Sequence, residues 1–222
     1  MEEHRVRLTD KERVTDEILF LTYTYPESFD FEAGQYVNLE LDVDGTTRYR
    51  PYSLYSHPDN DTLVFCVKLV DNGFASTYFK NVSEGASVPM HGPIGQFTLD
   101  TDQTNHVFLA TGAGIAPLHS MIKEAITNDA DTIELYHGIP TREDTIATKT
   151  LERLARKHDC FSFTQVYSRE DTGTTGYVQD HAPIRDDASY YLCGVKEFVE
   201  DTEATLRDSG VPEALINRER FS

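Results

Sequence analysis

His106-Val107-Phe108-Leu109-Ala110-Thr111-Gly112-Ala113-Gly114 is the stretch that decides the fold class of this 222-residue chain. Its first half is apolar without alternation, as expected of a short strand that is buried on both faces. Ile115–Thr127 follows with apolar residues at helical spacing. A strand, a glycine turn and a helix in this order form the first unit of a doubly wound sheet. Such a turn lets the backbone approach a pyrophosphate at the helix start, although a plain tight connection fits the same pattern.

The alternation of strands and helices continues to the end of the chain. It predicts a parallel sheet with right-handed crossovers, in which ligands bind at the carboxyl ends of the strands. The expected strands are Thr132–Tyr136, Phe161–Tyr167, Tyr190–Leu192 and Ala214–Phe221, and the expected helices are Asp144–His158 and Lys196–Asp208. The residues at the strand ends are Thr111, Gly112, His137, Gly138, Ser168, Arg169, Cys193 and Gly194.

The first hundred residues have a different pattern, in which short branched and aromatic runs alternate with turns. An Asp44-Gly45 turn indicates a hairpin, and the many short strands predict an antiparallel six-stranded β-barrel. The strand-like runs are Val6–Leu8, Ile18–Tyr25, Gln35–Leu41, Tyr49–Tyr55, Leu63–Val70 and Ser83–Met90, with a further short strand expected at Phe97–Leu99. A polar linker then separates an N-terminal barrel domain, residues 1–102, from a C-terminal α/β domain, residues 103–222.

The tetrapeptide Arg50-Pro51-Tyr52-Ser53 places four different chemical groups at the end of one of these strands. Arg50 carries a planar fork of donors suited to a phosphate, and Tyr52 carries an aromatic face with a polar tip. Pro51 fixes the backbone, and Ser53 adds a hydroxyl. A ligand with an anionic end and a flat heteroaromatic ring, such as a flavin nucleotide, would use all four. Alone, the tetrapeptide also fits an ordinary strand end.

A second candidate phosphate site follows the turn Asp71-Asn72-Gly73, where we expect a short helix at Phe74–Phe79. Unpaired amides at a helix start beside a glycine are well suited to bind a phosphate. The alternative is a simple connecting turn in which Ser76 caps the helix.

Composition excludes several classes of function. The net charge of −18 disfavours binding to nucleic acid or to acidic membranes. Three separated cysteines, and eight histidines without a short-spaced pair, predict no metal site and no disulfide. No apolar run is long enough to span a membrane, and the first residues lack the apolar core of a signal peptide, so we expect a cytoplasmic protein.

The excess of acidic residues has two explanations. One is an ordinary acidic surface, and the other is adaptation to high salt, where dense carboxylates stay hydrated and screening removes their repulsion. Loss of structure or activity at low ionic strength would support the second explanation, and indifference to salt would rule it out.

The order of these motifs resembles the ferredoxin–NADP reductase family. The resemblance rests on a barrel that carries Arg50-Pro51-Tyr52-Ser53, followed by Thr111-Gly112-Ala113-Gly114-Ile115-Ala116-Pro117 and by Cys193-Gly194, and it covers nearly the whole chain. It implies a two-domain fold that binds FAD in the barrel and NADP(H) or NAD(H) in the α/β domain. It also implies that any iron–sulfur cluster belongs to a separate protein, because the chain has no cysteine cluster.

The resemblance assigns roles around the flavin. Arg50 would bind the pyrophosphate, with Pro51 beside it, Tyr52 would pack on the isoalloxazine and ribityl chain, and Ser53 would approach flavin N5. Two further segments match the family, namely the flavin-phosphate segment with Gly73 and Ser76, and the turn with Gly92, Pro93 and Gly95 that closes the barrel.

It also assigns roles around the pyridine nucleotide. Thr111, Gly112 and Gly114 would cradle the pyrophosphate, with Pro117 in the first helical turn. Cys193, followed by Gly194, would lie beside the nicotinamide during hydride transfer, although a buried cysteine that acts only as a small apolar residue is the simpler explanation.

The last residues, Glu219-Arg220-Phe221-Ser222, are similar to the family's ending of a glutamate and an aromatic residue two positions later. By that resemblance Phe221 would cover the flavin face until nicotinamide displaces it, and Glu219 would relay protons. The chain departs from the pattern in having Phe in place of Tyr and the extra residue Ser222. A frayed tail is the alternative.

The preferred nucleotide depends on the segment Ser168-Arg169-Glu170, with Tyr177 and Gln179, which resembles the 2′-phosphate site of NADP-using members. Arg169 would pair with that phosphate. The lysine expected just before Tyr177 is missing, and Arg142 either replaces it or lies in a solvated loop. Because the segment as a whole resembles a 2′-phosphate site, we expect NADPH. A comparison of kcat/KM for NADPH and NADH would decide.

The expected activity is hydride transfer from NAD(P)H to FAD, followed by electron transfer to ferredoxin or flavodoxin. Ser53, Cys193 and Glu219 are the candidate catalytic residues. A reductase for an oxygenase component or for free flavin would share every motif. A non-catalytic flavin-binding or nucleotide-binding electron-transfer or sensor subunit is the alternative of another class. Because ferredoxins are usually acidic, the charge of the chain works against such a partner unless salt or a local arginine patch relieves it.

Overall fold

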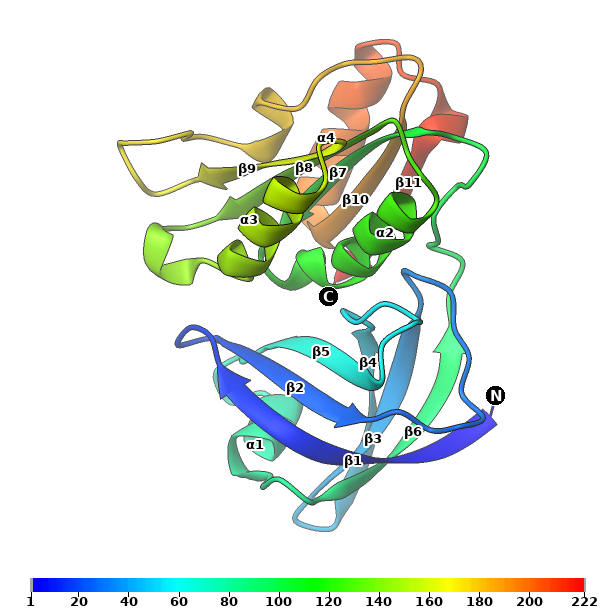
Figure 1. Cartoon of the computed structure of the whole chain (residues 1–222). Coiled ribbons are helices and arrows are strands. Elements are labelled where there is room, and N and C mark those ends of the chain that lie inside the picture. The colour runs from blue at the N-terminus through cyan, green and yellow to red at the C-terminus, as the bar shows by residue number, and fades with distance from the viewer. Residues whose placement is uncertain (1, 222) are drawn as a thin grey trace. The chain divides into compact units, whose positions relative to one another are not determined.

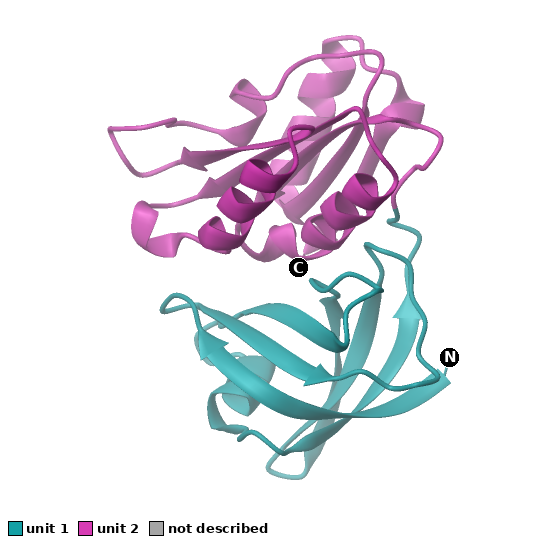
Figure 2. Ribbon diagram, viewed as in Figure 1, with its two compact units in different colours: residues 1–98 teal, residues 99–222 magenta. Residues whose placement is uncertain are grey.

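The computed structural model describes residues 2–221 and divides the chain into two compact units, residues 1–98 and residues 99–222 (Figure 2). The division falls just before the polar linker that the sequence indicates. Each unit has its own sheet and its own buried core.

The first unit is a six-stranded antiparallel sheet that curls on itself (Figure 1). Its strands lie in the order β4-β3-β6-β1-β2-β5, and an isolated bridge between Leu54 and Phe65 links the two ends of the sheet. The elements are β1 (Glu2–Arg13), β2 (Ile18–Thr24), β3 (Tyr36–Val43), β4 (Thr46–Ser53), β5 (Thr62–Lys68), α1 (Phe74–Asn81) and β6 (Ser87–Ile94). The predicted antiparallel barrel is confirmed.

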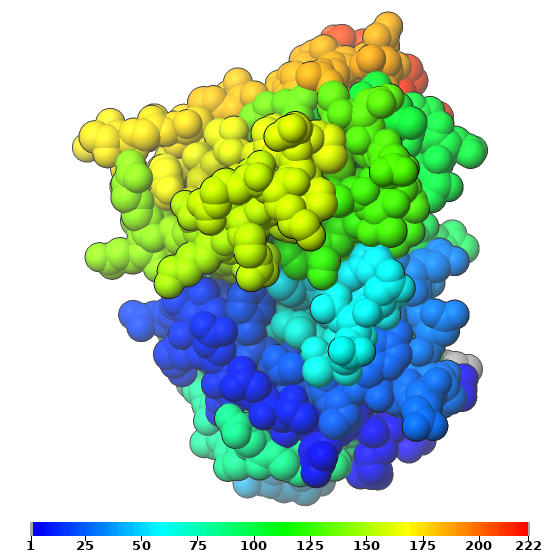
Figure 3. All heavy atoms as spheres, in the orientation of Figure 1, coloured from blue at the N-terminus to red at the C-terminus, as the bar shows by residue number. Residues whose placement is uncertain are grey.

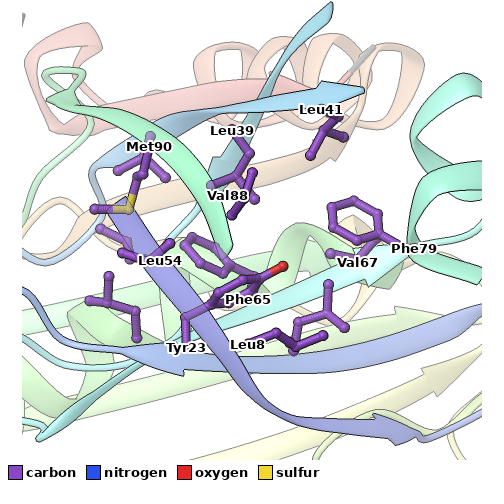
Figure 4. Packing of buried hydrophobic residues seen from close by; sticks show 14 of the residues in the cluster. Leu8, Tyr23, Leu39, Leu41, Leu54, Phe65, Val67, Phe79, Val88 and Met90 are labelled. Atoms are coloured by element: carbon purple, nitrogen blue, oxygen red, sulfur yellow. The ribbon is translucent and has the colours of Figure 1, made fainter. Parts of the chain in front are cut away.

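Alternation along the strands fills the barrel. Buried and exposed residues alternate in β1 and β3, because successive side chains of a strand point to opposite faces. Leu8, Leu39, Phe65 and Phe79 are almost completely buried and meet inside the curled sheet (Figure 4). Burial of such side chains contributes roughly 1.5–3 kcal/mol each, which makes this core the main source of stability for the unit.

The second unit is a five-stranded parallel sheet in the order β11-β10-β7-β8-β9. Figure 1 shows α2 and α3 on one face of this sheet and α4 on the other. The strands are β7 (Asn105–Thr111), β8 (Thr132–Ile139), β9 (Phe161–Tyr167), β10 (Ser189–Val195) and β11 (Ile216–Phe221). The helices are α2 (Ile115–Thr127), α3 (Thr148–Lys157) and α4 (Lys196–Asp208). This is the predicted doubly wound parallel sheet.

Two expected elements are wrong. No strand forms at Phe97–Leu99, because the chain leaves β6 through Gly95, whose φ of +110° ends the extended conformation. The helix expected to begin at Asp144 begins at Thr148 instead. Asp144 belongs to a separate turn, Arg142–Asp144, whose start is capped by Thr141, and Ala147 at φ +60° separates this turn from the helix.

Among residues 2–221, no helix is long and apolar enough to cross a membrane. No group of His, Cys, Asp and Glu within this range is arranged to hold a metal ion. Cys66, Cys160 and Cys193 are free thiols.

Candidate functional site

The first unit presents two guanidinium groups beside the start of α1. The guanidinium carbon of Arg48 lies 4.8 Å from the centroid of the Phe74 ring, and that of Arg50 lies 5.7 Å from it. Phe74 is the first residue of α1. Within residues 2–221, neither arginine forms an ion pair with a carboxylate, although the chain is rich in acidic side chains. The two cations therefore suit an anionic ligand such as a diphosphate.

The turn before α1 is held by Ser76. Its Oγ accepts a hydrogen bond of 2.7 Å from the Val70 amide, and the residue is only 4% exposed. Ser76 is therefore not the cap of the helix; Gly73 occupies the N-cap position and offers no side-chain cap. A Cβ atom on Gly73 would lie 3.0 Å from Ser76 Oγ. The tight turn leaves the first amides of α1 without a side-chain partner, as a phosphate requires.

Tyr52 and Arg50 lie two positions apart on β4 and so share one face of the strand. The Tyr52 ring meets Phe79 edge-on at 5.4 Å, and its burial raises the pKa of the phenol well above the ordinary range. Tyr52 therefore stays protonated and can donate a hydrogen bond to a ligand. Ser53, the last residue of β4, is buried and lies opposite Tyr36 on β3.

The predicted glycines at the end of β6 are required for packing against β3. A Cβ atom on Gly92 would lie 2.8 Å from Val37 Cγ1. At Gly95, a Cβ atom would lie 3.3 Å from the Tyr36 ring, and φ is +110°. These glycines bring the end of β6 next to the strand that pairs with Ser53.

In the second unit, the glycine turn after β7 packs directly against the end of β10. A Cβ atom on Gly114 would lie 2.2 Å from the Cys193 carbonyl oxygen, and one on Gly194 would lie 2.1 Å from Thr111 Oγ1. Gly112 has a φ of +52°. Thr111 Oγ1 is buried without a hydrogen-bond partner among the described residues. An orphaned hydroxyl at a glycine turn before a helix fits a nucleotide that supplies the missing partner.

His137 lies next to this turn and supports it. The position of His137 at the end of a predicted strand did not reveal this structural role. The side chain is completely buried, and its Nε2 lies 2.9 Å from the Gly112 carbonyl oxygen. A carbonyl only accepts, so Nε2 carries the proton and donates. Burial lowers the pKa of His137 to about 4, which keeps the imidazole neutral near pH 7. His137 thus ties the glycine turn to β8 instead of facing a ligand.

Cys193 is a buried, neutral thiol. It is 0% exposed, and burial, with a smaller contribution from the charge of Glu219, raises its pKa well above the ordinary value. A neutral thiol is a poor nucleophile. Its position between Ala110 of β7 and Glu219 of β11 in the sheet agrees with a small residue that shapes the site.

The final strand is held by ion pairs along one face. Arg218 Nε lies 2.8 Å from Glu203 on α4, and Arg220 Nη1 lies 3.1 Å from Glu200. Because side chains alternate along a strand, Glu219 and Phe221 project to the face opposite α4. Residues 216–221 are thus an ordered strand, not a frayed tail. Ser222 lies outside the described residues.

The segment after β9 holds the candidate 2′-phosphate residues. Arg169 is exposed, and its side chain has no ion-pair partner within residues 2–221. Tyr177 is 68% exposed, and the Ser168 amide donates to the Ile139 carbonyl oxygen. Arg142 lies in the same region and is ion-paired with Glu170, with 2.8 Å between Nε and Oε2. The ion pair holds Arg142 in place, while its side chain stays 55% exposed.

Comparison with known protein families matches both units. Residues 5–99 match a model of an oxidoreductase FAD-binding domain, and residues 108–204 match a model of an oxidoreductase NAD-binding domain. The positions of the Arg50 and Gly112 sites agree with these two assignments.

Individual relatives point the same way. The chain is 33% identical over 212 residues to ferredoxin–NADP reductase B of Sorangium cellulosum, covering 88% of this chain and 87% of that protein. It is also 33% identical to the reductase component of phenol 2-monooxygenase from Pseudomonas sp. strain CF600, of which it covers 58%. It thus spans little more than half the length of that relative.

Solved structures share the fold. A cytochrome P450 reductase of Amycolatopsis superposes with a TM-score of 0.89 at 26% identity, covering 99% of this chain and 70% of that one. A ferredoxin–NADP⁺ reductase of Neisseria gonorrhoeae, solved with FAD and NADP bound, gives 0.89 at 24% identity and covers 99% of both chains. On its near full-length likeness to the Sorangium enzyme and its two matching domains, the chain belongs to the ferredoxin–NADP reductase family of flavin-dependent oxidoreductases.

Proposed function

We propose that this protein takes a hydride from NADPH onto FAD and passes electrons to a separate acceptor protein. One observation carries the proposal. A single chain contains a cationic site at a helix start in its FAD-binding unit and a tightly packed glycine turn in its NAD-binding unit. Each suits the diphosphate of one nucleotide.

The first unit would hold FAD through side chains and amides that neither gain nor lose a proton when the cofactor binds. Arg50 and the start of α1 bind the diphosphate, and Gly73 and Ser76 shape that turn. Tyr52 packs against the flavin and donates its phenol proton, while Ser53 places a hydroxyl near N5. FAD supplies the redox chemistry, accepting a hydride and releasing electrons. The protein's contribution is to hold and align the two rings.

The second unit would hold the pyridine nucleotide. The Thr111 hydroxyl and the amides of Gly112 and Gly114 bind the pyrophosphate, next to Pro117 in the first turn of α2. His137 holds this turn through its hydrogen bond to the Gly112 carbonyl oxygen. Cys193 and Gly194 leave room for the nicotinamide, with the thiol protonated throughout. In this proposal Glu219 relays protons, and the Phe221 ring covers the flavin face until nicotinamide displaces it.

The nucleotide is NADPH in this proposal, because Arg169, which directly follows Ser168, is an exposed cation without an acidic partner among the described residues. The exposed Tyr177 lies later in the same segment after β9. A guanidinium without an acidic partner is well suited to bind a 2′-phosphate through a bidentate pair of hydrogen bonds. A strong kinetic preference for NADH would refute this assignment.

The acceptor is a ferredoxin or flavodoxin, by analogy with the reductase of Sorangium cellulosum that this chain matches nearly end to end. A second candidate is a reductase that serves an oxygenase, since the chain also matches the reductase component of a phenol 2-monooxygenase. We place the reaction in the cytoplasm, where cysteines such as the three here remain reduced.

The decisive experiment is an anaerobic titration of the purified protein. NADPH should bleach the yellow absorbance of bound flavin, and added ferredoxin, flavodoxin or oxygenase component should restore it when it is the acceptor. A colourless protein that does not respond to NADPH would contradict the proposal and favour a non-catalytic sensor or electron-transfer subunit.

A further inference from the structure

The ion pair between Arg142 and Glu170 joins two segments at one edge of the NAD-binding unit. Arg142 begins the turn after β8, and Glu170 follows β9. The Glu170 carboxylate accepts from the Arg142 backbone amide through one oxygen and from the guanidinium Nε, at 2.8 Å, through the other. Figure 3 shows the yellow atoms that follow β9 on the surface, at the left edge of the view.

The Arg142 guanidinium makes further contacts within the same unit. Nη2 donates to the Thr172 carbonyl oxygen at 3.1 Å, and the guanidinium carbon lies 4.8 Å from the centre of the Tyr167 ring. A Cβ atom on Gly173 would lie 2.8 Å from Nη2. Nε and Nη2 of Arg142 are thus engaged within the unit, while the side chain as a whole stays 55% exposed.

Glu170 is the less exposed partner. Its side chain is 18% exposed, against 55% for Arg142. It directly follows Arg169, the exposed cation that is the candidate 2′-phosphate ligand. An acidic side chain near the ribose favours a nucleotide with a 2′-hydroxyl, whereas it repels one with a 2′-phosphate. An uncompensated carboxylate at position 170 would therefore oppose the action of Arg169.

We propose that Arg142 sets the nucleotide preference indirectly, by neutralising and holding Glu170 so that Arg169 alone presents its charge to the 2′-position. Arg142 is then a specificity-determining residue that does not touch the phosphate. The inference rests on the proposed use of NAD(P)H. Its test measures a change in the NADPH/NADH preference between variants, so it can be applied whichever nucleotide the natural protein prefers.

The experiment compares four variants of the FAD-loaded protein with ferricyanide as electron acceptor. These are R142M, E170Q, the double variant R142M/E170Q, and R169M as the control for direct phosphate contact. For each, kcat/KM is measured with NADPH and with NADH, and melting temperature reports folding. R142Q and R142Q/E170Q provide a second pair if R142M folds poorly, because glutamine keeps a polar side chain but cannot neutralise Glu170.

The proposal expects R142M to lower the NADPH/NADH ratio of kcat/KM about tenfold, since it leaves Glu170 charged beside Arg169. Adding E170Q should restore the ratio to within about twofold of the natural protein, whereas R169M should stay low. The dissociation constants of adenosine 2′,5′-bisphosphate and of 5′-AMP should follow the same pattern, which a purely structural role would not produce.

Two outcomes would overturn the inference. Either R142M and R142Q both keep the natural ratio, or the double variants stay as low as the single ones, which would make Arg142 itself the phosphate ligand. Failure of the proposed function is a separate result, because the natural protein would then reduce ferricyanide with neither nucleotide.

Discussion

In our proposal each of the two units holds a diphosphate, and the two candidate sites are built from different groups. The FAD-binding unit offers two charged side chains, the exposed Arg48 and the half-buried Arg50, which lie over the Phe74 ring beside a helix start. The NAD-binding unit uses backbone packed to the limit of contact at Gly114, supported by the buried neutral His137. The first site should therefore respond to charge and salt, and the second to changes in shape.

The largest effect is expected from Gly114→Ala. Its Cβ would lie 2.2 Å from a backbone carbonyl, which cannot move as a side-chain tip can, and such overpacking costs about 3 kcal/mol or more. We expect flavin reduction by NADPH, measured by anaerobic stopped flow, to fall about a hundredfold while bound FAD is retained. Gly210→Ala is the control, since its site is open and only its φ of +90° is unfavourable. Normal reduction by the Gly114 variant would break the comparison.

The next effect concerns acid stability and His137. Burial lowers the pKa of the folded protein's imidazole to about 4, below the ordinary value of 6.5. The unfolded chain therefore binds the proton first, and stability is full above pH 6.5 and declines as the pH falls toward 4, by up to about 3 kcal/mol.

Urea unfolding at a series of pH values checks this expectation. His137→Gln keeps a donor for the Gly112 carbonyl but does not titrate, so it should lose less stability than the natural protein between pH 6.5 and 4. Using the difference between the two proteins removes the common contribution of the carboxylates. Parallel pH profiles would show that His137 does not titrate in this window.

A somewhat smaller effect is expected from Arg50→Met in the first unit. Hydrogen bonds to charged groups contribute roughly 1.5–3 kcal/mol, so the dissociation constant of FAD should rise at least about tenfold. Arg48→Met is the matched variant on the same ring and should have a weaker effect, since only Arg50 belongs to the matching tetrapeptide. Added salt should weaken FAD binding more in the natural protein than in the Arg50 variant. Equal salt dependence would show that Arg50 does not contact the diphosphate.

The sequence was sufficient where a local pattern determines the structure. The apolar run at His106–Ala110, the glycine turn and the helical spacing of Ile115–Thr127 correspond to β7, the turn and α2 of the structure. The alternation of strands in the first hundred residues likewise predicts the antiparallel sheet. In these segments each residue's neighbours in sequence decide its conformation.

Contacts between distant segments could not be read in this way. Nothing in the spacing shows that Arg142 would bind Glu170 or that His137 would donate to Gly112, because each partner comes from another element of the sheet. The missing strand at Phe97–Leu99 has a similar cause, since the apolar Phe97 is buried in a segment that is not a β-strand. Burial identified from sequence does not specify which partner provides it.

The smallest effect in this series separates the support of the flavin site from its ligands. Lys11 on β1 donates to the carbonyl oxygens of Lys80 and Val82, at 3.1 and 3.0 Å, and so holds the carboxyl end of α1. Lys11→Met should cost about 1 kcal/mol of unfolding free energy, as expected for partly exposed hydrogen bonds. Because the diphosphate lies at the opposite end of α1 in our proposal, FAD affinity should change by less than about threefold. Chemical denaturation and FAD titration of one preparation test both statements. A large loss of FAD affinity at unchanged stability would mean that the position of the whole helix, and not the charge of Arg50, limits flavin binding.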